Sequence, residues 1–580
     1  MQTPVALAPI SYRWVQRGKT EDAGALTALE SALQLPSLLC RLLLRRGHSD
    51  VESAKQYLKP RLDRLHDPFL LTDMEAAVNR LERALQSGER ILVHGDYDVD
   101  GICAATLLTR VLRRLGGQVE PFVPHRMHDG YDLSQAGVRA AANAGATLIV
   151  TGDCGIVAHT PIAAAAQLGI DVIVTDHHSP GDVLPAACAI VNPNRADCGY
   201  PNPALAGVGV AFKVCQALWA RRGLPAQDLW YYLDLVAVAT IADLAPLSGE
   251  NRIMAKYGLR LLSQSHNPGL RALLDTAGLA GFDSLGAGQV SHVLAPRINA
   301  VGRMSEASKG VRLLLEDDDS VAQVLAKVLE EENRTRQAVD RETLARALEM
   351  LEETYDPARD YAIVLGGEGW HPGVIGIVAS RLVERLHRPT ILFALDANAS
   401  LARGSARSIP GFHLFNAVKE CSSYLERYGG HKYAAGMDIR PERIAEFRDA
   451  FQAVARNRLT PEDLIPELSY DLELPLERAT LDLTRLLRHF GPFGVGNPGP
   501  IFVARGLEVT SAREVGEGHM KLELRQAGAR LSAIGFGMAE RLRQVEPAHA
   551  RIDIAFQLQE NYWNGNVELQ ARLIDVRFSE

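Results

Sequence analysis

The chain has 580 residues, 47% of them hydrophobic, and a formal net charge of −8 at pH 7 from 62 Lys and Arg against 70 Asp and Glu. At roughly 150 residues per domain this length predicts several domains, and a mean hydropathy of −0.05 excludes a disordered or collagen-like protein. The acidic balance excludes a uniformly basic nucleic-acid coat but allows a local basic groove.

Cellular location follows from three further features of the sequence. No apolar stretch reaches the roughly 18 residues of a membrane helix, so no membrane contact is expected. The first residues, MQTPVALAPISYRW, lack the basic and apolar regions of an export signal. The seven cysteines contain no CxxC pair, which excludes a disulfide framework and a zinc knuckle. We therefore expect a cytoplasmic protein.

Residues 1–85 are expected to form a helical lead-in, and an alternating pattern begins after them. Strands are predicted at 90–94, 119–123, 147–151 and 172–175, and helices between them at 104–115, 134–144 and 160–168. Strand alternating with helix predicts an α/β fold with a parallel sheet covered on both faces. We assign this first α/β domain to residues 86–315.

Three regions follow it. Residues 316–356 predict one long helix, either a bridge between domains or a surface helix, and residues 357–458 a second, smaller α/β domain with strands at 361–365 and 390–394. Residues 459–580 open with a proline-punctuated linker and contain five strands, at 501–509, 521–525, 531–536, 552–558 and 567–578. That number suits an OB-like barrel that binds nucleic acid, with the last two strands joined through Trp563-Asn564-Gly565.

The first chemical motif, HGDYDVDG at 94–101, follows an apolar strand. It places His94, Asp96, Asp98 and Asp100 at the carboxyl end of that strand, where ligand sites of open parallel sheets lie. Clustered aspartates also occur as solvated turn formers, which is the alternative for this motif alone.

The next elements end in the same way. Asp153 follows the strand at 147–151, and Asp176, His177 and His178 follow the strand at 172–175. The apolar segment 233–242 ends in Asp243, although an ordinary helix with a terminal carboxylate explains that residue equally well. Repeated delivery of Asp and His to one sheet edge predicts a shared metal site.

The side-chain types in this predicted site indicate which metal ion it binds and which reaction class it serves. Carboxylates with imidazoles and no thiolate favour Mn²⁺ or Mg²⁺ over structural zinc. Four or more acids indicate two ions, and two ions about 3.5 to 4 Å apart can activate water and clamp a phosphate. Phosphoester hydrolysis is the predicted reaction class.

These motifs, together with the downstream GGH at 429–431, resemble the DHH phosphoesterase superfamily. Within it, APRINAVGRM (295–304), HPGVIGIVASRL (371–382) and GSARS (404–408) are similar to the bacterial single-strand-specific exonucleases, and the similarity runs from about residue 40 to the end. Where members of that family often carry Asn after the Asp153 position, this chain has Cys154, which we expect to be a packed side chain.

The resemblance implies a 5′→3′ exonuclease of single-stranded DNA that releases 5′-mononucleotides in DNA repair and recombination. It implies two divalent cations, Mn²⁺ or Mg²⁺, and His178 as a neighbour that acts either on the substrate or on the residues that hold the metal ions. The implied metal ligands are His94, Asp98, Asp100, Asp153, His177 and Asp243.

Substrate contacts are expected from both α/β domains, with the active site in the cleft between them. By resemblance we assign Arg303, Ser405 and Arg407 to a 5′-phosphate pocket and His431 to the scissile phosphate, with surface salt bridges or a core histidine as the alternatives. In the barrel, Tyr562 and Trp563 are the aromatics expected to be exposed for base stacking. The others, Phe502, Phe536, Phe556 and Phe578, are expected in the core.

Two other functions stay open at this point. One is a DHH-type phosphoesterase of short oligoribonucleotides or cyclic dinucleotides, and the other is a non-catalytic DNA-binding scaffold. The resemblance also implies single-strand-binding protein and repair helicases as partners of a monomeric enzyme.

Overall fold

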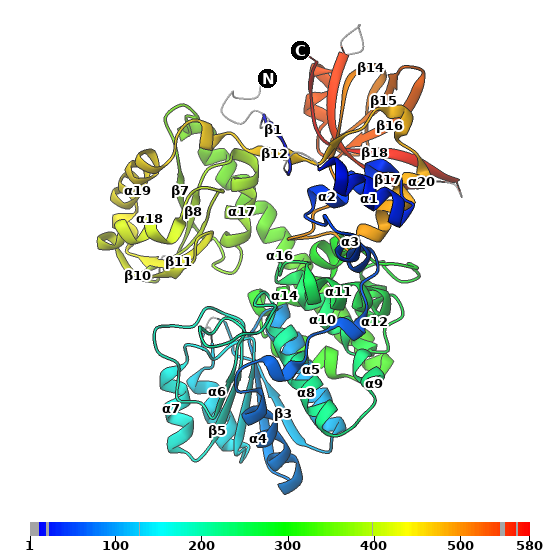
Figure 1. The fold of residues 1–580 in the computed structure, drawn as a ribbon. Coiled ribbons are helices and arrows are strands. Elements are labelled where there is room, and N and C mark those ends of the chain that lie inside the picture. Colours follow the sequence, from blue (N-terminus) through cyan, green and yellow to red (C-terminus); the bar gives the residue numbers. More distant parts are fainter. Residues whose placement is uncertain are drawn as a thin grey trace. The chain divides into compact units, whose positions relative to one another are not determined.

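The computed structural model describes residues 11–18, 22–126, 128–130, 132–396, 398–545, 551–563 and 566–579. Contacts divide the chain into two units. Unit 1 comprises residues 1–55, 337–488 and 500–580, and unit 2 comprises residues 56–336 and 489–499. Unit 2 contains the first predicted α/β region, and unit 1 contains the second together with the C-terminal strands (Figure 1).

Unit 2 is built on a five-stranded sheet in which every pair of neighbours is parallel, in the order β3-β2-β4-β5-β6. The strands are β2 (Arg90–Gly95), β3 (Gln118–Phe122), β4 (Leu148–Gly152), β5 (Asp171–Thr175) and β6 (Ala189–Val191). The predicted parallel sheet is confirmed. Because β3 lies on one side of β2 and β4 on the other, the order reverses at the carboxyl ends of β2 and β4, where ligands of such sheets bind.

Helices cover both faces of this sheet. In β2, Ile91 and Val93 belong to one apolar cluster and Leu92 to another, and β4 and β5 alternate in the same way. The first cluster includes residues of α4 (Met74–Ser87), α5 (Val99–Arg114) and α8 (Gly207–Arg221). The second includes residues of α6 (Gln135–Asn143) and α7 (His159–Gln167).

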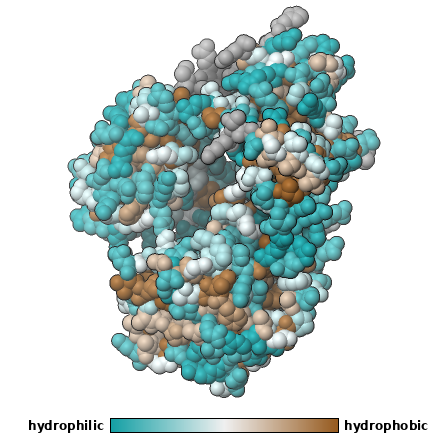
Figure 2. All heavy atoms as spheres, viewed as in Figure 1, coloured by the Kyte–Doolittle hydropathy of each residue, from teal (hydrophilic) through white to brown (hydrophobic). Residues whose placement is uncertain are grey.

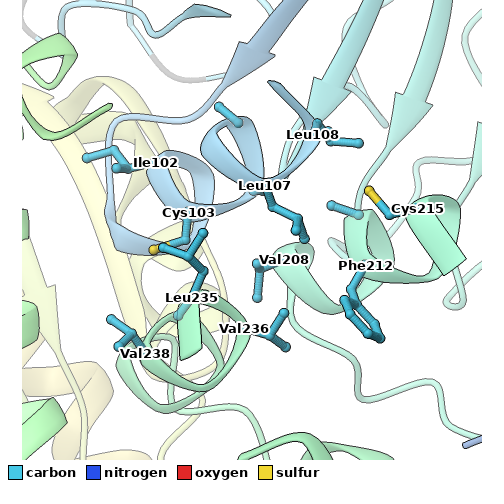
Figure 3. Packing of buried hydrophobic residues seen from close by; sticks show 14 of the residues in the cluster. Ile102, Cys103, Leu107, Leu108, Val208, Phe212, Cys215, Leu235, Val236 and Val238 are labelled. Carbon is cyan, nitrogen blue, oxygen red and sulfur yellow. The ribbon is translucent and has the colours of Figure 1, made fainter. Parts of the chain in front are cut away.

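Three helices that carry site residues pack against one another. Figure 3 shows Leu107 of α5, Val208 of α8 and Val236 of α10 (Leu233–Ala242) in one buried cluster. The apolar segment 233–242 is therefore a helix that is buried on all sides, as its sequence requires. This packing fixes the first turns of α5 and α8 and the last turn of α10. The other helices of this unit are α9 (Ala226–Trp230), α11 (Gly249–Leu262), α12 (Pro268–Thr276), α13 (Ala287–Gln289), α14 (Ala295–Met304) and α15 (Ser308–Leu315).

The long helix is also present. It is α16 (Asp319–Thr354), and it contains the division between the two units at residues 336 and 337. Asp318 caps its first turn, since Oδ1 accepts hydrogen bonds from the backbone N–H of Ser320 (2.8 Å) and Val321 (3.1 Å).

The second α/β region, in unit 1, has a mixed sheet in the order β10-β11-β9-β8-β7. Strands β7 (Ile363–Glu368) and β8 (Thr390–Leu395) are parallel. Strands β9 (Ala402–Arg407), β10 (Leu425–Gly430) and β11 (Ala434–Ile439) add antiparallel pairs. The helices are α17 (Ile375–Leu386), α18 (Leu414–Glu420) and α19 (Ile444–Arg458). The GSARS segment thus begins within β9, and the first two residues of the GGH segment end β10.

The C-terminal region forms a closed barrel. Strands β14 (Phe502–Val515), β15 (His519–Gln526), β16 (Ala529–Gly535), β18 (Asn566–Phe578) and β17 (Arg551–Trp563) follow one another, and β17 pairs back to β14. The predicted OB-like barrel is confirmed. Strand β13 (Leu472–Glu473) extends the sheet beside β14, and helix α20 (Leu481–Leu487) precedes the barrel.

The division of the barrel's aromatic residues into buried and exposed ones differs in part from the prediction. Phe502 and Phe556 are buried, as expected, and Tyr562 is exposed. Phe536 and Phe578, expected in the core, are 53% and 55% exposed because both lie at strand ends, where the barrel interior closes. The side chain of Trp563 and the residues Asn564 and Gly565 lie outside the described part of the chain.

The N-terminal lead-in is not entirely helical. It contains α1 (Ala23–Leu33), α2 (Ser37–Arg45) and α3 (Val51–Leu58), but its described part also contains strand β1 (Arg13–Gln16). That strand pairs in parallel with β12 (Glu467–Tyr470), and Trp14 donates a hydrogen bond to Asp575 (2.8 Å), so it belongs with the C-terminal region.

Hydrophilic residues cover most of the face in Figure 2, with separate apolar areas between them. Among the described residues, no helix combines the length and the hydrophobicity needed to span a bilayer.

Candidate metal centre

Of the three aspartates of the first motif, Asp96 and Asp98 lie in the tight turn between β2 and α5, and Asp100 lies in the first turn of α5. Asp98 caps α5, since its Oδ1 accepts hydrogen bonds from the N–H groups of Asp100 (3.0 Å) and Gly101 (3.1 Å). A Cβ on Gly101 would lie 2.3 Å from the backbone N of Asp96, so this position requires glycine. The DYDVDG sequence therefore brings three carboxylates to the end of β2.

Asp153 follows β4 in a backbone conformation that L-residues rarely adopt, with φ +66°. Two carboxylates hold the loop behind it. Gly155 N–H donates to Oδ1 of Asp132 (2.5 Å), and Ile156 N–H donates to Oδ2 of Asp176 (3.0 Å). This anchoring offsets the cost of the unusual conformation and aims the Asp153 carboxylate at the sheet edge.

The DHH segment after β5 gives its two imidazoles different roles. His177 Nδ1 lies 3.0 Å from the carbonyl oxygen of Leu205. Because a carbonyl only accepts, Nδ1 carries the proton, and Nε2 is left with a lone pair. Burial lowers the pKa of His177 to about 4, so the ring is neutral at pH 7. A neutral imidazole with a free Nε2 lone pair has the form that a metal ligand requires.

His178 instead pairs with Asp176. Its Nδ1 lies 2.8 Å from Oδ1 of that aspartate. Burial lowers the pKa of His178, but the hydrogen bond and the charge of Asp176 outweigh it and raise the value to about 9. His178 is therefore a cation at neutral pH.

The first turn of α8 fixes Asp100. Both oxygens of this carboxylate accept backbone hydrogen bonds, Oδ2 from Gly207 (2.7 Å) and Oδ1 from Val208 (2.8 Å). A Cβ on Gly207 would lie 2.5 Å from Oδ1 of Asp153, so glycine is needed where the helix passes the two acids. One helix end thus positions two site residues.

These elements bring most of the sequence-predicted residues together. Nε2 of His177 lies 3.1 Å from Oδ1 of Asp153, 4.0 Å from Oδ2 of Asp100 and 3.9 Å from Oδ2 of Asp243. In each of three groups the candidate ligand atoms lie within 4.8 Å of one another. The groups are Asp96, Asp98 and Asp153; Asp100, His177 and Asp243; and Asp153, His177 and His178.

The arrangement fits divalent cations and is unfavourable without them. Oδ1 of Asp153 and Nε2 of His177 are buried, lack a hydrogen-bond partner and direct lone pairs toward each other. Burial and neighbouring carboxylates raise the pKa values of Asp100 and Asp153, and burial with the charge of Asp98 raises that of Asp243 to about 7. A hard cation between these atoms would satisfy both the orphaned lone pairs and the excess negative charge.

His94 lies outside all three groups. Its ring packs 5.2 Å from that of Phe122, and Nδ1 lies 3.6 Å from Sγ of Cys154. Burial lowers the pKa of His94 to about 4 and raises that of the Cys154 thiol, so Cys154 is a packed side chain here. Asp96, which the sequence places in the motif but which was not among the predicted ligands, joins Asp98 and Asp153 instead.

Two arginines lie beside the first motif. Helix α14 passes so close that a Cβ on Gly302 would lie 2.3 Å from the carbonyl oxygen of Tyr97, which brings the neighbouring Arg303 to this turn. The guanidinium of Arg126 lies 4.9 Å from the centre of the Tyr97 ring. Sequence analysis missed Arg126, although it follows β3 at the same sheet edge as the acids.

Two of the predicted phosphate residues of unit 1, Ser405 and Arg407, lie beside the start of α17. Ser405 and Arg407 lie on one face of β9, with the guanidinium Nη1 3.3 Å from the serine Oγ. A Cβ on Gly376, in the first turn of α17, would lie 2.8 Å from Ser405 Oγ and 2.9 Å from Arg407 Nη2. His431 is exposed in the turn between β10 and β11. A helix N-terminus with a hydroxyl and a guanidinium suits a phosphate group.

A pocket of about 290 Å³ opens beside the acidic groups of unit 2. It is lined by His177, Asn194, Pro203, Ala204, Leu205, Asp243, Ala245 and Pro246. Since His177 and Asp243 line it directly, this pocket connects the cluster with solvent.

Comparison with known families gives three matches along the chain. The DHH family, N-terminal domain, matches residues 90–240; the DHHA1 domain matches residues 359–457; and the RecJ OB domain matches residues 470–575. The first contains nearly every candidate ligand, and Asp243 lies just beyond it.

Relatives over the full chain agree. The chain is 37% identical to the single-stranded-DNA-specific exonuclease RecJ of Bacillus subtilis strain 168, over 98% of this chain and 71% of the relative. It is similar to the crystal structure of RecJ in complex with Mn²⁺ from Thermus thermophilus, with a TM-score of 0.82 and 34% identity over 98% of this chain and 80% of that one. For the complex of that protein with Mg²⁺ the TM-score is 0.76 and the identity 32%, over 98% and 78%. The chain therefore belongs to the RecJ family of single-stranded-DNA-specific exonucleases.

Proposed function

We propose that this chain hydrolyses single-stranded DNA from the 5′ end, releasing 5′-mononucleotides, with divalent cations held by the acidic edge of unit 2. One observation carries the proposal: the lone pair of neutral His177 faces three carboxylates across 3.1 to 4.0 Å. Divalent cations between its members would relieve the repulsion within such a cluster, and paired cations serve phosphodiester hydrolysis.

Two adjoining sets of side chains would hold the ions. Asp96, Asp98 and Asp153 form one set, and Asp100, His177 and Asp243 the other, with Asp153 near both. Mn²⁺ or Mg²⁺ bound there would act as Lewis acids on a phosphate and on the attacking water. The resemblance-based assignment of His94 as a ligand remains a prediction.

The protein's own groups would prepare the substrate. His178, kept cationic by Asp176, places a positive charge next to the carboxylates, where it offsets the repulsion of an incoming phosphate. Arg303, which follows Gly302 in α14, adds a positive charge near Tyr97. These groups bind and orient the substrate, because both are cations at neutral pH and a group that keeps its proton does not act as a general base.

The 5′ preference is assigned to unit 1. Ser405, Arg407 and the first turn of α17 offer donors for a terminal phosphate, and His431 offers a further one for the strand. A phosphate carries no sequence information, so this grip predicts cleavage that is independent of sequence.

Two alternatives are weaker. A non-catalytic scaffold would have no use for a cluster that retains every predicted carboxylate and His177 in mutual range. A phosphoesterase of short oligoribonucleotides or cyclic dinucleotides would not need the RecJ OB domain at 470–575.

The direct test uses 30-nucleotide single strands labelled at either end and incubated with Mn²⁺ or Mg²⁺. We expect a 5′ label to appear at once as mononucleotide, while a 3′ label stays in gradually shortened strands. Early release of the 3′ label, or hydrolysis confined to very short RNA, would refute the proposal. The variant Asp98→Ala should bind the strand and leave it intact.

Location and partners form the last part of this proposal. Cytoplasmic action as a monomer, with single-strand-binding protein and repair helicases as partners, is expected from the family resemblance. Sedimentation of the purified chain with and without each partner measures both the monomer and the complexes.

A further inference from the structure

The first turn of helix α11 contains three consecutive polar residues that are buried. Glu250, Asn251 and Arg252 are at most 4% exposed, and none of them belongs to the groups of candidate metal ligands. Helix α11 packs against α10, which is capped at its carboxyl end by Asp243 (Figure 1). Buried polar side chains are kept where they make specific hydrogen bonds, so their partners indicate what this turn does.

Asn251 joins two loops of unit 2. Its Nδ2 donates hydrogen bonds to the carbonyl oxygens of Ala204 (2.5 Å) and Pro246 (3.1 Å). Because a carbonyl oxygen only accepts, the atom between these two oxygens is the amide nitrogen. One side chain therefore fixes the separation between the loop of residues 203–205 and the loop of residues 244–247.

The two loops hold ligands of the same candidate ion. The carbonyl oxygen of Leu205, in the first loop, lies 3.0 Å from Nδ1 of His177 and fixes that ring. The second loop begins directly after Asp243, and residues of both loops line the pocket of about 290 Å³. The group to which these two ligands belong, here called the His177 set, consists of Asp100, His177 and Asp243.

The chain leaves α10 in a conformation that needs support from other residues. Leu244 has φ +59° although it is not a glycine. It is 61% exposed, so burial of its own side chain does not hold it there. Such a conformation persists only where the surrounding structure fixes the backbone. The loop of residues 244–247 must therefore be held by its neighbours.

Residues 494–497, here called the 494–497 turn, contact this loop. The N–H of Leu247 donates a hydrogen bond to the carbonyl oxygen of Val495 (2.7 Å). Gly496 has φ +72°, and a Cβ on it would lie 2.9 Å from Cβ of Pro246. Only a glycine allows the backbone to approach Pro246 so closely, so the turn supports the loop at two adjacent residues.

The 494–497 turn is itself fixed by buried polar groups. Two backbone hydrogen bonds, of 2.9 and 3.1 Å, close it between residues 494 and 497. The side chain of Asn497 donates to the carbonyl oxygens of Phe490 (2.9 Å) and Pro492 (2.8 Å). Arg252 of α11 donates to the carbonyl oxygen of Gly491 (2.8 Å). The first turn of α11 thus holds the 244–247 loop directly through Asn251 and indirectly through Arg252.

We propose that Asn251 is a positioning residue of the metal centre, which holds His177 and Asp243 at the separation that one divalent cation needs, and that the 494–497 turn supports it. The inference rests on the proposed function, because it concerns the same cluster. Ligand atoms must lie within about 0.2 Å of their ideal distances, so a loop that is free to shift weakens the ion that it helps to hold.

The amide oxygen of Asn251 supports this role. It is buried and has no hydrogen-bond partner among the described residues. A leucine would fill nearly the same volume without burying an unpaired oxygen, so packing does not explain an asparagine at this position. The two hydrogen bonds that the amide nitrogen donates are what leucine lacks.

The inference distinguishes the two candidate ions. Neither loop contributes to the other group, here called the Asp96 set, which consists of Asp96, Asp98 and Asp153. In the His177 set, Asp100 is fixed separately by the backbone N–H groups of Gly207 and Val208. Loss of the Asn251 amide should therefore weaken the ion of the His177 set and leave the ion of the Asp96 set in place.

The first test measures Mn²⁺ binding to the metal-free, full-length chain by isothermal titration calorimetry without DNA. Asn251→Leu keeps the volume and removes both hydrogen bonds, so affinity should fall about tenfold at one of two sites and less than twofold at the other. Asn251→Ala removes the same bonds without filling the space and should give the same result. Equal weakening at both sites, or wild-type affinities in both variants, overturns the inference.

A matched control separates positioning from stability. Asn267 also donates a side-chain hydrogen bond to a carbonyl oxygen, that of Leu314 (2.9 Å), and it caps α12. Asn267→Leu should lower the melting temperature and leave both Mn²⁺ affinities unchanged. The same site-specific loss of Mn²⁺ in Asn267→Leu would mean that any destabilisation of unit 2 has this effect, and would overturn the role of Asn251.

The second test concerns the 494–497 turn. Gly496→Ala should press on Pro246 and weaken the same Mn²⁺ site about threefold or more. Gly278→Ala is the control, because Gly278 has φ +69° but a Cβ on it would meet no atom within 4 Å. Both variants carry the same backbone strain and should lower the melting temperature, but only Gly496→Ala should lose Mn²⁺. Equal Mn²⁺ affinities in the two variants overturn the support by the turn.

A third measurement separates this inference from the proposed function. Because Asn251 acts through the ion, saturating Mn²⁺ should restore the exonuclease rate of Asn251→Leu to within about twofold of the wild type. A lower rate that excess Mn²⁺ does not restore contradicts a role through the ion. A wild-type chain that binds two Mn²⁺ ions, loses one in Asn251→Leu and degrades no DNA would refute the proposed function alone. An active wild type whose Mn²⁺ affinities are unchanged in Asn251→Leu would refute the positioning role alone.

Discussion

The two sets of candidate substrate-handling groups differ in burial and in the way they are held. In unit 2, Asp96, Asp100 and Asp153 are at most 3% exposed and follow parallel strands, held by backbone hydrogen bonds and close glycines. In unit 1, Arg407 is half-buried and His431 exposed, on or beside antiparallel strands. The difference indicates a division of labour: chemistry requires buried groups fixed in advance, whereas grip on a flexible strand requires reachable, solvated donors.

The substitution with the largest expected effect tests whether the buried carboxylates of unit 2 carry the chemistry, and it is made at Asp153. Asp153→Asn keeps the shape but removes a charge shared by both ligand sets, and we expect kcat to fall by about a thousandfold or more. Affinity for a strand without divalent cations should stay within twofold. Asp182→Asn, an exposed carboxylate of the same unit, is the control. A folded Asp153→Asn enzyme with ordinary turnover would remove the metal centre from the mechanism.

A second pair of substitutions tests whether Asp96 or His94 binds the metal ions in the buried cluster of unit 2. Because Asp96 lies in a ligand group and His94 does not, Asp96→Asn should lower kcat by about a hundredfold and His94→Gln by less than about threefold. Titration calorimetry with Mn²⁺ gives the matching affinities. The reverse order of effects would restore His94 as the ligand that the family resemblance implies.

A substitution at Arg407 tests whether the solvated groups of unit 1 bind the strand without taking part in the chemistry. Arg407→Gln removes a charged donor at the start of α17, and the preference for a 5′-phosphate over a 5′-hydroxyl end should fall about 10- to 100-fold. The kcat on the hydroxyl end should not change. Arg448→Gln, an exposed arginine on α19, should keep the preference. A lower kcat on both ends would assign Arg407 to the chemistry and contradict the division.

The cluster of Asp and His residues at the sheet edge could be predicted from the sequence because the pattern that marks it is local. An apolar run followed by Asp or His indicates the carboxyl end of a parallel strand. Asp243 stayed ambiguous, since only the packing of α10 against α5 brings the end of a helix to that edge. The choice between His94 and Asp96 depends on how Asp98 closes the turn, a geometry that alternation along the chain does not contain.

The strands and the exposed aromatic side chains of unit 1 were harder to predict from the sequence. Strands β9 and β10 are rich in Gly, Ser and Arg and lack the β-branched pattern that marks strands, so the antiparallel half of that sheet was not predicted. Phe536 was assigned to the core because a small barrel needs large residues inside. The side that a ring at the end of a strand takes depends instead on the local backbone. The turn at Gly537, fixed by His519, decides it here.

Asp132 supports the buried cluster of unit 2 indirectly, because its carboxylate accepts a hydrogen bond from Gly155 in the loop that follows Asp153. Asp132→Gly tolerates the φ of +78° but loses the acceptor for Gly155, so Mn²⁺ affinity should fall about tenfold at unchanged melting temperature. Asp132→Asn keeps an oxygen acceptor and should bind Mn²⁺ like the wild type. The Mn²⁺ concentration for half-maximal activity measures the effect. Equal values for both variants and the wild type would remove Asp132 from the support of Asp153.

The smallest expected effect is a pH dependence of the stability that cations confer. Burial and Asp98 raise the pKa of Asp243 to about 7, so the metal-free folded protein binds a proton there more tightly than the unfolded chain. Its contribution to stability therefore decreases as pH rises through 7, and a cation, which needs the carboxylate ionised, compensates for that loss only at higher pH. The increase in melting temperature caused by saturating Mn²⁺ should thus grow from pH 6 to pH 8, by about 3 °C per pH unit at most. Asp243→Asn should flatten this dependence while Asp182→Asn preserves it. An increase that is the same at every pH would mean that no buried carboxylate of unit 2 exchanges its proton for the ion, and the contrast between buried chemistry and solvated grip would lose its electrostatic basis.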